Sequence, residues 1–345
     1  MKKQHFIGGR IAKTGIAVLS TALICNWLHW PAVFAVITSI VSIEPTVMDS
    51  IKKGLVRFPA SAIGSAFAVL FISLFHDSPI TYAAAAVFTI FTCYKLKLHD
   101  GLLVAALTSV AMVDVIHSNL IIAFFIRLGT TTIGLVVSAL VNFLILPPNY
   151  SLTISKRITV LLADTGKNLT AIIDTLLNSE NDFLHPVDSF LHAREELDKS
   201  ERLCQFQKED WRFHRFTEVE YQAFYIDEYK LQQLRKIHYH LGNLMFIPKQ
   251  PLRWTMDQKE NIASLTESLV NALRTPATMY NNLHLVKEAR AYFKTLILEL
   301  EADEREHSAG VFSSEFIILY ELLSIFELIE TLYSKPQGSA SFSNA

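Results

Sequence analysis

Six runs of apolar side chains, separated by short polar turns, fill the first 150 residues of the chain. The runs cover residues 11–28, 30–43, 59–75, 80–94, 102–116 and 120–146. A helix needs about 20 apolar residues to cross the hydrocarbon core of a bilayer. Two runs are short by that measure, and they become long enough if the neighbouring polar turns lie among the headgroups. The pattern favours six membrane-spanning helices over the buried helices of a soluble core.

A different pattern begins after Pro147 and Pro148, which stop the last apolar run. Apolar residues now recur three and four positions apart, as in LLADTGKNLTAIIDTLL at 161–177, which predicts amphipathic helices. The expected helices cover residues 151–180, 187–207, 216–246, 255–273, 277–306 and 311–334. The predicted fold is all-α, with a six-span transmembrane bundle at 1–149, a cytoplasmic helical domain at 150–334 and a disordered tail at 335–345.

Charge predicts the orientation of the spans, because short cytoplasmic loops are enriched in lysine and arginine. Basic residues precede the first run and lie between the second and third runs and between the fourth and fifth. The turns LHWP, HDSP and IHSN carry no lysine or arginine. The first run also lacks a signal-peptide cleavage site of the usual kind. We therefore expect a multi-pass protein of the cell (plasma) membrane with both termini in the cytoplasm.

The membrane half contains an internal similarity. Residues 30–64 align with residues 100–134 without a gap when the sequence is shifted by 70 positions. The informative matches are an acid, an arginine 13 residues later and a glycine seven beyond that: Glu44 with Asp114, Arg57 with Arg127, and Gly64 with Gly134. This predicts a duplication with copies at about 10–75 and 80–146. Three spans in each copy would invert the second copy relative to the first, as in many transporters.

Arg127 lies inside an apolar run, where a charge costs roughly 2.5–3.5 kcal/mol on insertion scales. A functional anion or a buried carboxylate would account for it, and the alternative is a side chain that reaches the outer headgroups. Asp114 and Glu44 are the candidate partners of Arg127 and Arg57, as proton carriers or as structural ion pairs. Lys13, inside the first run, is a third candidate cation or an interfacial anchor.

Small residues follow each arginine at intervals of four and predict a smooth strip on one helix face, which favours close helix packing over chemistry. The two strips are Ala60, Gly64 and Ala68, and Thr130, Gly134 and Ser138.

The stretches KTGIA (13–17), VITSIVSIEPTVMDSIKKGLVR (36–57), RLGTTTIG (127–134) and LVNFLILPPNY (140–150) resemble the bacterial aromatic acid exporter family. That family is related to fusaric acid resistance proteins and, remotely, to plant aluminium-activated malate channels. Its motif runs roughly Arg-x-x-Gly-Thr-x-x-Gly. The arginines and last glycines match in both copies, whereas Ala60 and Thr130 replace the first glycine. The resemblance implies that Arg57 and Arg127 line a path for anions.

The leading hypothesis is a transporter that exports organic anions, with aromatic carboxylates as cargo and Arg57, Arg127 and Lys13 as binding groups. A passive anion channel and a membrane-anchored scaffold are the alternatives. No nucleophile–base pair, metal-ligand spacing or nucleotide loop occurs, so we expect no catalytic residues, no metal, no cofactor and no enzyme activity. The expected partners are a small organic anion, the bilayer and further copies of the chain, and not nucleic acid.

Overall fold

The computed structural model describes residues 4–115, 119–145, 150–178, 184–213, 217–247, 252–274, 283–307 and 313–334. Every regular element in these ranges is helical, so the all-α prediction is confirmed. Pro147 and Pro148, and the predicted tail at 335–345, lie outside the described residues. Two compact units divide the chain: one contains Met1–Asn149 and Phe206–Arg215, and the other contains Tyr150–Gln205 and Phe216–Ala345.

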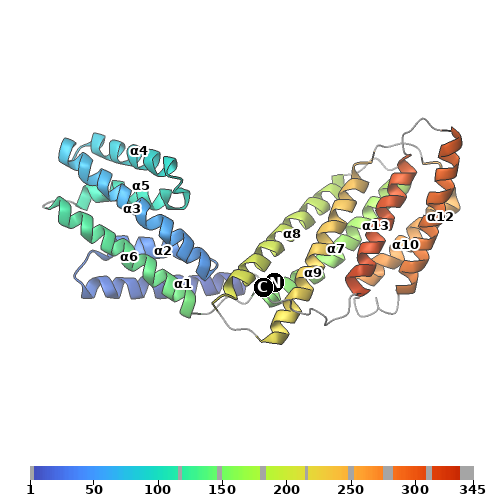
Figure 1. The fold of residues 1–345 in the computed structure, drawn as a ribbon, viewed down its shortest axis with the longest axis horizontal. Helices are drawn as coiled ribbons and strands as arrows, with labels where there is room; N and C mark the ends of the chain where they lie inside the picture. The colour runs from blue at the N-terminus through green and yellow to red at the C-terminus, as the bar shows by residue number, and fades with distance from the viewer. Residues whose placement is uncertain are drawn as a thin grey trace. The chain divides into compact units, whose positions relative to one another are not determined.

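Each predicted apolar run of the N-terminal unit corresponds to one helix (Figure 1). The helices are α1 (Gln4–Trp27), α2 (Ala32–Ser42), α3 (Val47–Phe75), α4 (Pro79–Lys95), α5 (Leu102–Val115) and α6 (Leu120–Leu144), with the 3₁₀ turn η1 (His99–Gly101) before α5. Two of the starts follow the expected capping rules: the Thr46 hydroxyl accepts a hydrogen bond from the backbone N–H of Asp49 at 3.1 Å, and Ser78 caps α4 ahead of Pro79.

Two helices of the described chain, α3 and α6, are long and apolar enough to cross a bilayer. By contrast, α2 has 11 residues, α5 has 14 and α4 has 17. At about 1.5 Å per residue, α2 covers only about half of a hydrocarbon core roughly 30 Å thick. The predicted count of six spans therefore stays a prediction.

The N-terminal unit has polar groups inside and apolar groups outside. Large apolar side chains are exposed along its helices, among them Leu19, Leu55, Val87, Leu107 and Val136. Hydroxyl-bearing side chains share the interior with apolar ones such as Ile43, Met112 and Val113. The hydroxyl-bearing residues that are at most 1% exposed include Thr38, Ser39, Ser61, Ser65, Thr108, Thr130, Thr131 and Ser138. A water-soluble domain would normally show the opposite arrangement, so this unit is built for apolar surroundings.

Two close helix contacts of this unit involve positions that are related by the 70-residue shift. A Cβ atom on Gly64 of α3 would lie 2.4 Å from the carbonyl oxygen of Ala105 in α5. A Cβ atom on Gly134 of α6 would lie 2.5 Å from the carbonyl oxygen of Ala35 in α2. Exchanging positions 70 apart converts one contact into the other. Ser61 meets its own counterpart, because its hydroxyl lies 3.1 Å from that of Thr131.

The second unit holds α7 (Ser151–Asn178), most of α8 (Leu184–Asp210), and four further helices of the described chain. These are α9 (Glu218–Met245), α10 (Met256–Arg274), α12 (Leu283–His307) and α13 (Ser314–Ser334). Its core is apolar in the ordinary way, with Ile172, Ile237, Phe293 and Phe326 buried. The contacting pairs include α7 with α9 and α10, and α13 with α9 and α12.

The contact at Gly64 makes a stability prediction. Gly64→Ala should lower the stability by about 1–3 kcal/mol, because a backbone carbonyl cannot rotate away from the new methyl group. This loss should outweigh the gain of about 1 kcal/mol that alanine normally brings inside a helix. Gly54→Ala on the same helix is the matched control, because its Cβ would meet only Leu135 Cδ2 at 3.9 Å. Melting temperatures in detergent test the pair, and equal values would contradict the prediction.

His238 makes a prediction about pH. Its ring is 5% exposed and stacks on Phe190 with 3.9 Å between the ring centres, and burial lowers its pKa from about 6.5 to about 4. Arg235 and Arg194 act in the same direction, whereas Asp198 opposes them. The folded state therefore binds its proton less readily than the unfolded chain, and stability falls as pH drops below about 6.5.

The loss at pH 5 should be on the order of 2 kcal/mol. His238→Phe keeps the ring stack and removes the titrating group, so its unfolding midpoint should change less between pH 7.5 and 5 than that of the wild type. Thermal unfolding at both pH values measures this difference. An equal acid sensitivity of the two proteins would rule out His238 as the cause.

Candidate functional site

Arg57 projects from the middle of α3 and is 7% exposed. Its Nη2 atom donates to the Glu44 carboxylate at 2.7 Å, and its Nε atom donates to the backbone oxygen of Asp100 at 3.2 Å. The other Glu44 oxygen accepts from Lys53 at 2.8 Å. One carboxylate thus pairs with two cations at the turn between α2 and α3, and this network draws on three separate segments of the unit.

Arg127 projects from α6 and is only 4% exposed. Its Nη2 atom donates to the hydroxyl of Thr108 on α5, and its guanidinium carbon lies 4.2 Å from the centre of the Phe34 ring on α2. Its Nε and Nη1 atoms are buried and make no hydrogen bond to the described part of the chain. No carboxylate among the described residues forms a salt bridge with this guanidinium.

Asp114 does not reach Arg127 in the structure, although their spacing suggested a pair. It is exposed near the end of α5 and accepts a hydrogen bond from the Tyr82 hydroxyl of α4. Asp114 lies six residues after Thr108, which places it about 120° away around the helix. The counterpart Glu44 follows the end of α2 and precedes Pro45, so its backbone leaves the helix and turns toward Arg57.

Lys13 of α1 is connected through Asn142 to the turn between α2 and α3 that contains Glu44. It is buried, and its ammonium donates to the side-chain oxygen of Asn142 on α6 at 2.9 Å. The Asn142 amide nitrogen lies 3.0 Å and 2.9 Å from the backbone oxygens of Glu44 and Thr46. It also lies 2.9 Å from the Ser50 hydroxyl. Asn142 therefore ties α1 and α6 to the turn between α2 and α3.

The two small-residue strips lie in helix contacts. Ala60, Ala68, Thr130 and Ser138 are at most 1% exposed, and Gly64 and Gly134 make the close approaches described above. A Cβ on Gly101 would also meet the Cβ of Ala60 at 2.5 Å. The strips bring α3 and α6 close enough to their neighbours for the arginines to be enclosed.

The sequence does not indicate Phe34 as part of the site, and it indicates Asn142 only as a satisfied interfacial or interhelical group. Phe34 faces Arg127, whereas the neighbouring Phe125 is 63% exposed. Under the 70-residue shift Phe34 aligns with Val104, so the aromatic ring at position 34 has no equivalent at position 104. This difference is the signal that could have indicated Phe34. Asn142 has an apolar counterpart as well, Ile72. In both cases, the side chain that contacts a cation stands at a position where the two aligned segments differ.

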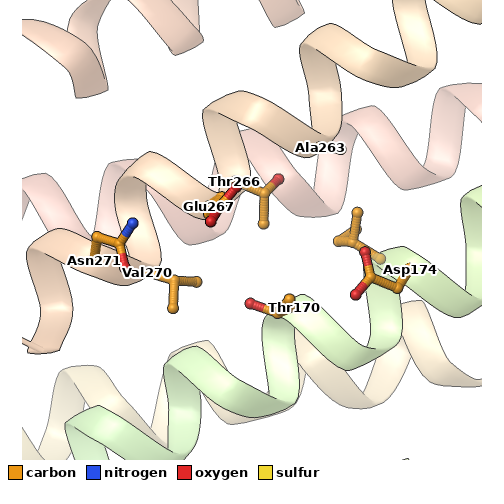
Figure 2. Close-up of a pocket in the computed structure, with 8 residues that line it drawn as sticks. Thr170, Asp174, Ala263, Thr266, Glu267, Val270 and Asn271 are labelled. Atoms are coloured by element: carbon orange, nitrogen blue, oxygen red, sulfur yellow. The ribbon is translucent and has the colours of Figure 1, made fainter.

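A cavity of about 280 Å³ lies between α7 and α10 in the second unit. Figure 2 shows Thr170 and Asp174 on α7 across from Thr266, Glu267 and Asn271 on α10. The lining contains two acidic side chains and no basic one, so the cavity is unsuited to an anion. No group of three potential metal ligands occurs in the part of the chain that the structure describes; His117 and His214 lie outside that part, as does the side chain of His185.

Comparisons with known proteins give one family match in the N-terminal unit and relatives that span nearly the whole chain. Residues 5–145 match the family described as aromatic acid exporter family member 1. The whole chain is similar to proteins named UPF0421: one from Oceanobacillus iheyensis is 46% identical, covering 96% of this chain and 97% of the relative. One from Bacillus cereus is 40% identical over 99% and 98% of the two chains, and one from Staphylococcus haemolyticus is 35% identical over 96% and 98%.

Proposed function

The chain belongs to the aromatic acid exporter family and, along its whole length, to the UPF0421 proteins, and from this premise we propose that it is a membrane transporter exporting organic anions, with aromatic carboxylates as cargo. The observation that carries this proposal is Arg127, a buried guanidinium with two unpartnered nitrogens in the described structure and no carboxylate partner. A buried charge of this kind is costly unless something of opposite charge reaches it. The cargo carboxylate would supply that charge.

The geometry around Arg127 suits an aromatic acid. A guanidinium binds a carboxylate through parallel N–H···O bonds, and the two unpartnered nitrogens Nε and Nη1 are donors for such bonds. The Phe34 ring lies beside the same guanidinium and offers an apolar face to an aromatic ring. Charge and ring would thus be recognised side by side at one place between α2, α5 and α6.

Arg57 takes the second role in this proposal, in which a proton removes the charge of its partner Glu44 during transport. When Glu44 binds a proton, Arg57 loses its counter-charge and becomes able to attract cargo. Glu44 would therefore couple export to proton movement, and Asp114, which is exposed and bonded to Tyr82, would have no part in coupling. Lys13 would keep the turn in place through Asn142 rather than bind cargo directly.

The proposed membrane arrangement is six spans in two inverted repeats of about residues 10–75 and 80–146, with both termini in the cytoplasm. The contacts of Gly64 and Gly134 support it, because they exchange under the 70-residue shift, and so does the meeting of Ser61 with Thr131. The short helices α2 and α5 would then meet near mid-membrane. Residues 1–149 would form the transport domain and residues 150–334 the cytoplasmic domain.

A single copy of six helices leaves little room for a path through the membrane, and wide apolar faces of the unit remain exposed. We therefore include association of several copies in the proposal, with these faces against lipid or a neighbouring copy.

Arg127→Ala tests the proposal. Efflux of benzoate from proteoliposomes should fall about 10- to 100-fold, because a charge-assisted hydrogen bond to the cargo is lost. Arg127→Lys should recover only part of the rate, since lysine lacks the forked geometry. Lys95→Ala, at an exposed cation over the Phe91 ring, is the control. Unchanged efflux by a folded Arg127→Ala protein would favour a scaffold over a transporter.

Glu44→Gln tests coupling and separates a transporter from a passive channel. Wild-type benzoate transport should increase with an imposed pH gradient, whereas the Glu44→Gln protein should transport benzoate downhill at a rate independent of that gradient. Asp100→Asn is the matched control, because Asp100 touches Arg57 through its backbone oxygen and not its carboxylate. Wild-type transport that ignores the pH gradient would favour the channel.

A further inference from the structure

Residues 206–213 belong to the N-terminal unit although they lie far along the chain. They include the last turn of α8, and they bring an acidic pair to the turn between α2 and α3. The Thr46 hydroxyl and the Glu209 carboxylate are 3.0 Å apart, and the second Glu209 oxygen lies 3.9 Å from the ammonium of Lys52. Two groups of the turn therefore hold one carboxylate.

Asp210 adds a second carboxylate at the same turn. It is fully buried and close enough to Lys13 to interact with its charge. Phe213 fixes the segment further by an edge-to-face contact with Phe143 of α6, with 6.4 Å between ring centres. The segment is thus fixed by charge and by an apolar contact.

The groups that face these carboxylates are Lys13, Thr46 and Lys52, and together with the neighbouring Lys53 we call them the cationic turn. Lys53 already pairs with Glu44, which also holds Arg57, so the cationic turn leads directly to the arginine site. One acidic side chain opposes the arrangement, because Asp49 faces Glu209 closely enough for the two charges to repel. This repulsion opposes the hold of Thr46 and Lys52 on Glu209.

We propose that the cationic turn binds the carboxylate of cargo on its way to the arginines, and that Glu209 and Asp210 occupy it until cargo displaces them. This inference rests on the proposed export function and adds to it a first binding site, of which the ligand class is a small monocarboxylate. The Glu209 carboxylate shows how such a ligand would bind, because it contacts the Thr46 hydroxyl and lies near the Lys52 ammonium, which are groups that a free acid would also contact. The same contact makes the segment a brake on transport at low cargo concentration.

Glu209→Gln tests the brake while keeping the size and hydrogen-bonding ability of the side chain. Benzoate binding to the purified full-length protein is measured from the concentration that gives half of the maximal thermal stabilisation. That concentration should fall about two- to fivefold in Glu209→Gln, the range expected for one partly exposed ion pair. Glu195→Gln, an exposed acid of the same helix that pairs with Lys199, is the control and should match the wild type.

Lys52→Met is the second variant, because it removes a cation of the turn itself. Its half-effect concentration should rise, although it also loosens Glu209. A purely structural contact would lower the melting temperature of both variants and leave their benzoate concentrations unchanged, which would overturn this inference. If benzoate binds the wild type, is lost in Arg127→Ala and is unaffected by Glu209→Gln, only the brake fails. If no variant and no wild-type protein binds benzoate or any other aromatic acid, the export proposal fails with it.

Discussion

Close packing of α3 against α5, and of α6 against α2, is the constraint on which the N-terminal unit depends. Gly64 and Gly134 allow these helices to approach until a carbonyl oxygen occupies the space of a side chain. At that distance, only small side chains fit between them, and many of those that do carry hydroxyls. The large apolar side chains are displaced to the outside, which produces the reversed polarity of the unit. The same closeness encloses the two arginines and leaves them few possible partners.

The two arginines have different surroundings because one backbone position differs between the two segments that the 70-residue shift aligns. Pro45 follows Glu44 and stands just beyond the end of α2, whereas its counterpart Val115 continues α5 through Asp114. A proline disfavours the helical conformation in the residue before it, so Glu44 is released from the helix and Asp114 is not. Glu44 consequently neutralises Arg57, and Arg127 must rely on the Thr108 hydroxyl and the Phe34 ring.

Much of the fold could be predicted from the sequence, because apolar runs and 3.6-residue periodicity report helices directly. All six apolar runs lie in helices, and the predicted segments of the second half correspond to α7 to α10, α12 and α13 within the described residues. The small-residue strips also indicated which helix faces approach closely. These features are local, and each depends on residues within a few turns of one another.

The candidate site was less predictable, because it depends on contacts between distant segments. The spacing of Asp114 and Arg127 suggested a pair, but spacing does not show whether a helix continues through the acid. Phe34 and Asn142 lie in apolar runs, where one ring or one amide carries no distinctive signal. Glu209 comes from the other half of the chain, and no periodicity connects residue 209 with residue 46. Only the three-dimensional arrangement brings these groups together.

Unequal arginines suit a transporter better than equal ones. Two free guanidinium groups in an apolar interior would hold a carboxylate so firmly that it could not leave, and the site would carry two uncompensated charges when empty. In the structure Glu44 compensates the charge of Arg57, and the Phe34 ring and the Thr108 hydroxyl stabilise the charge of Arg127 by about 1–2 kcal/mol. In the proposed cycle, the carboxylate of cargo would replace that of Glu44 at Arg57, so Arg57 would be paired both before and after cargo binds. The empty and the loaded states become close in energy, and this is the condition for a site to release what it binds.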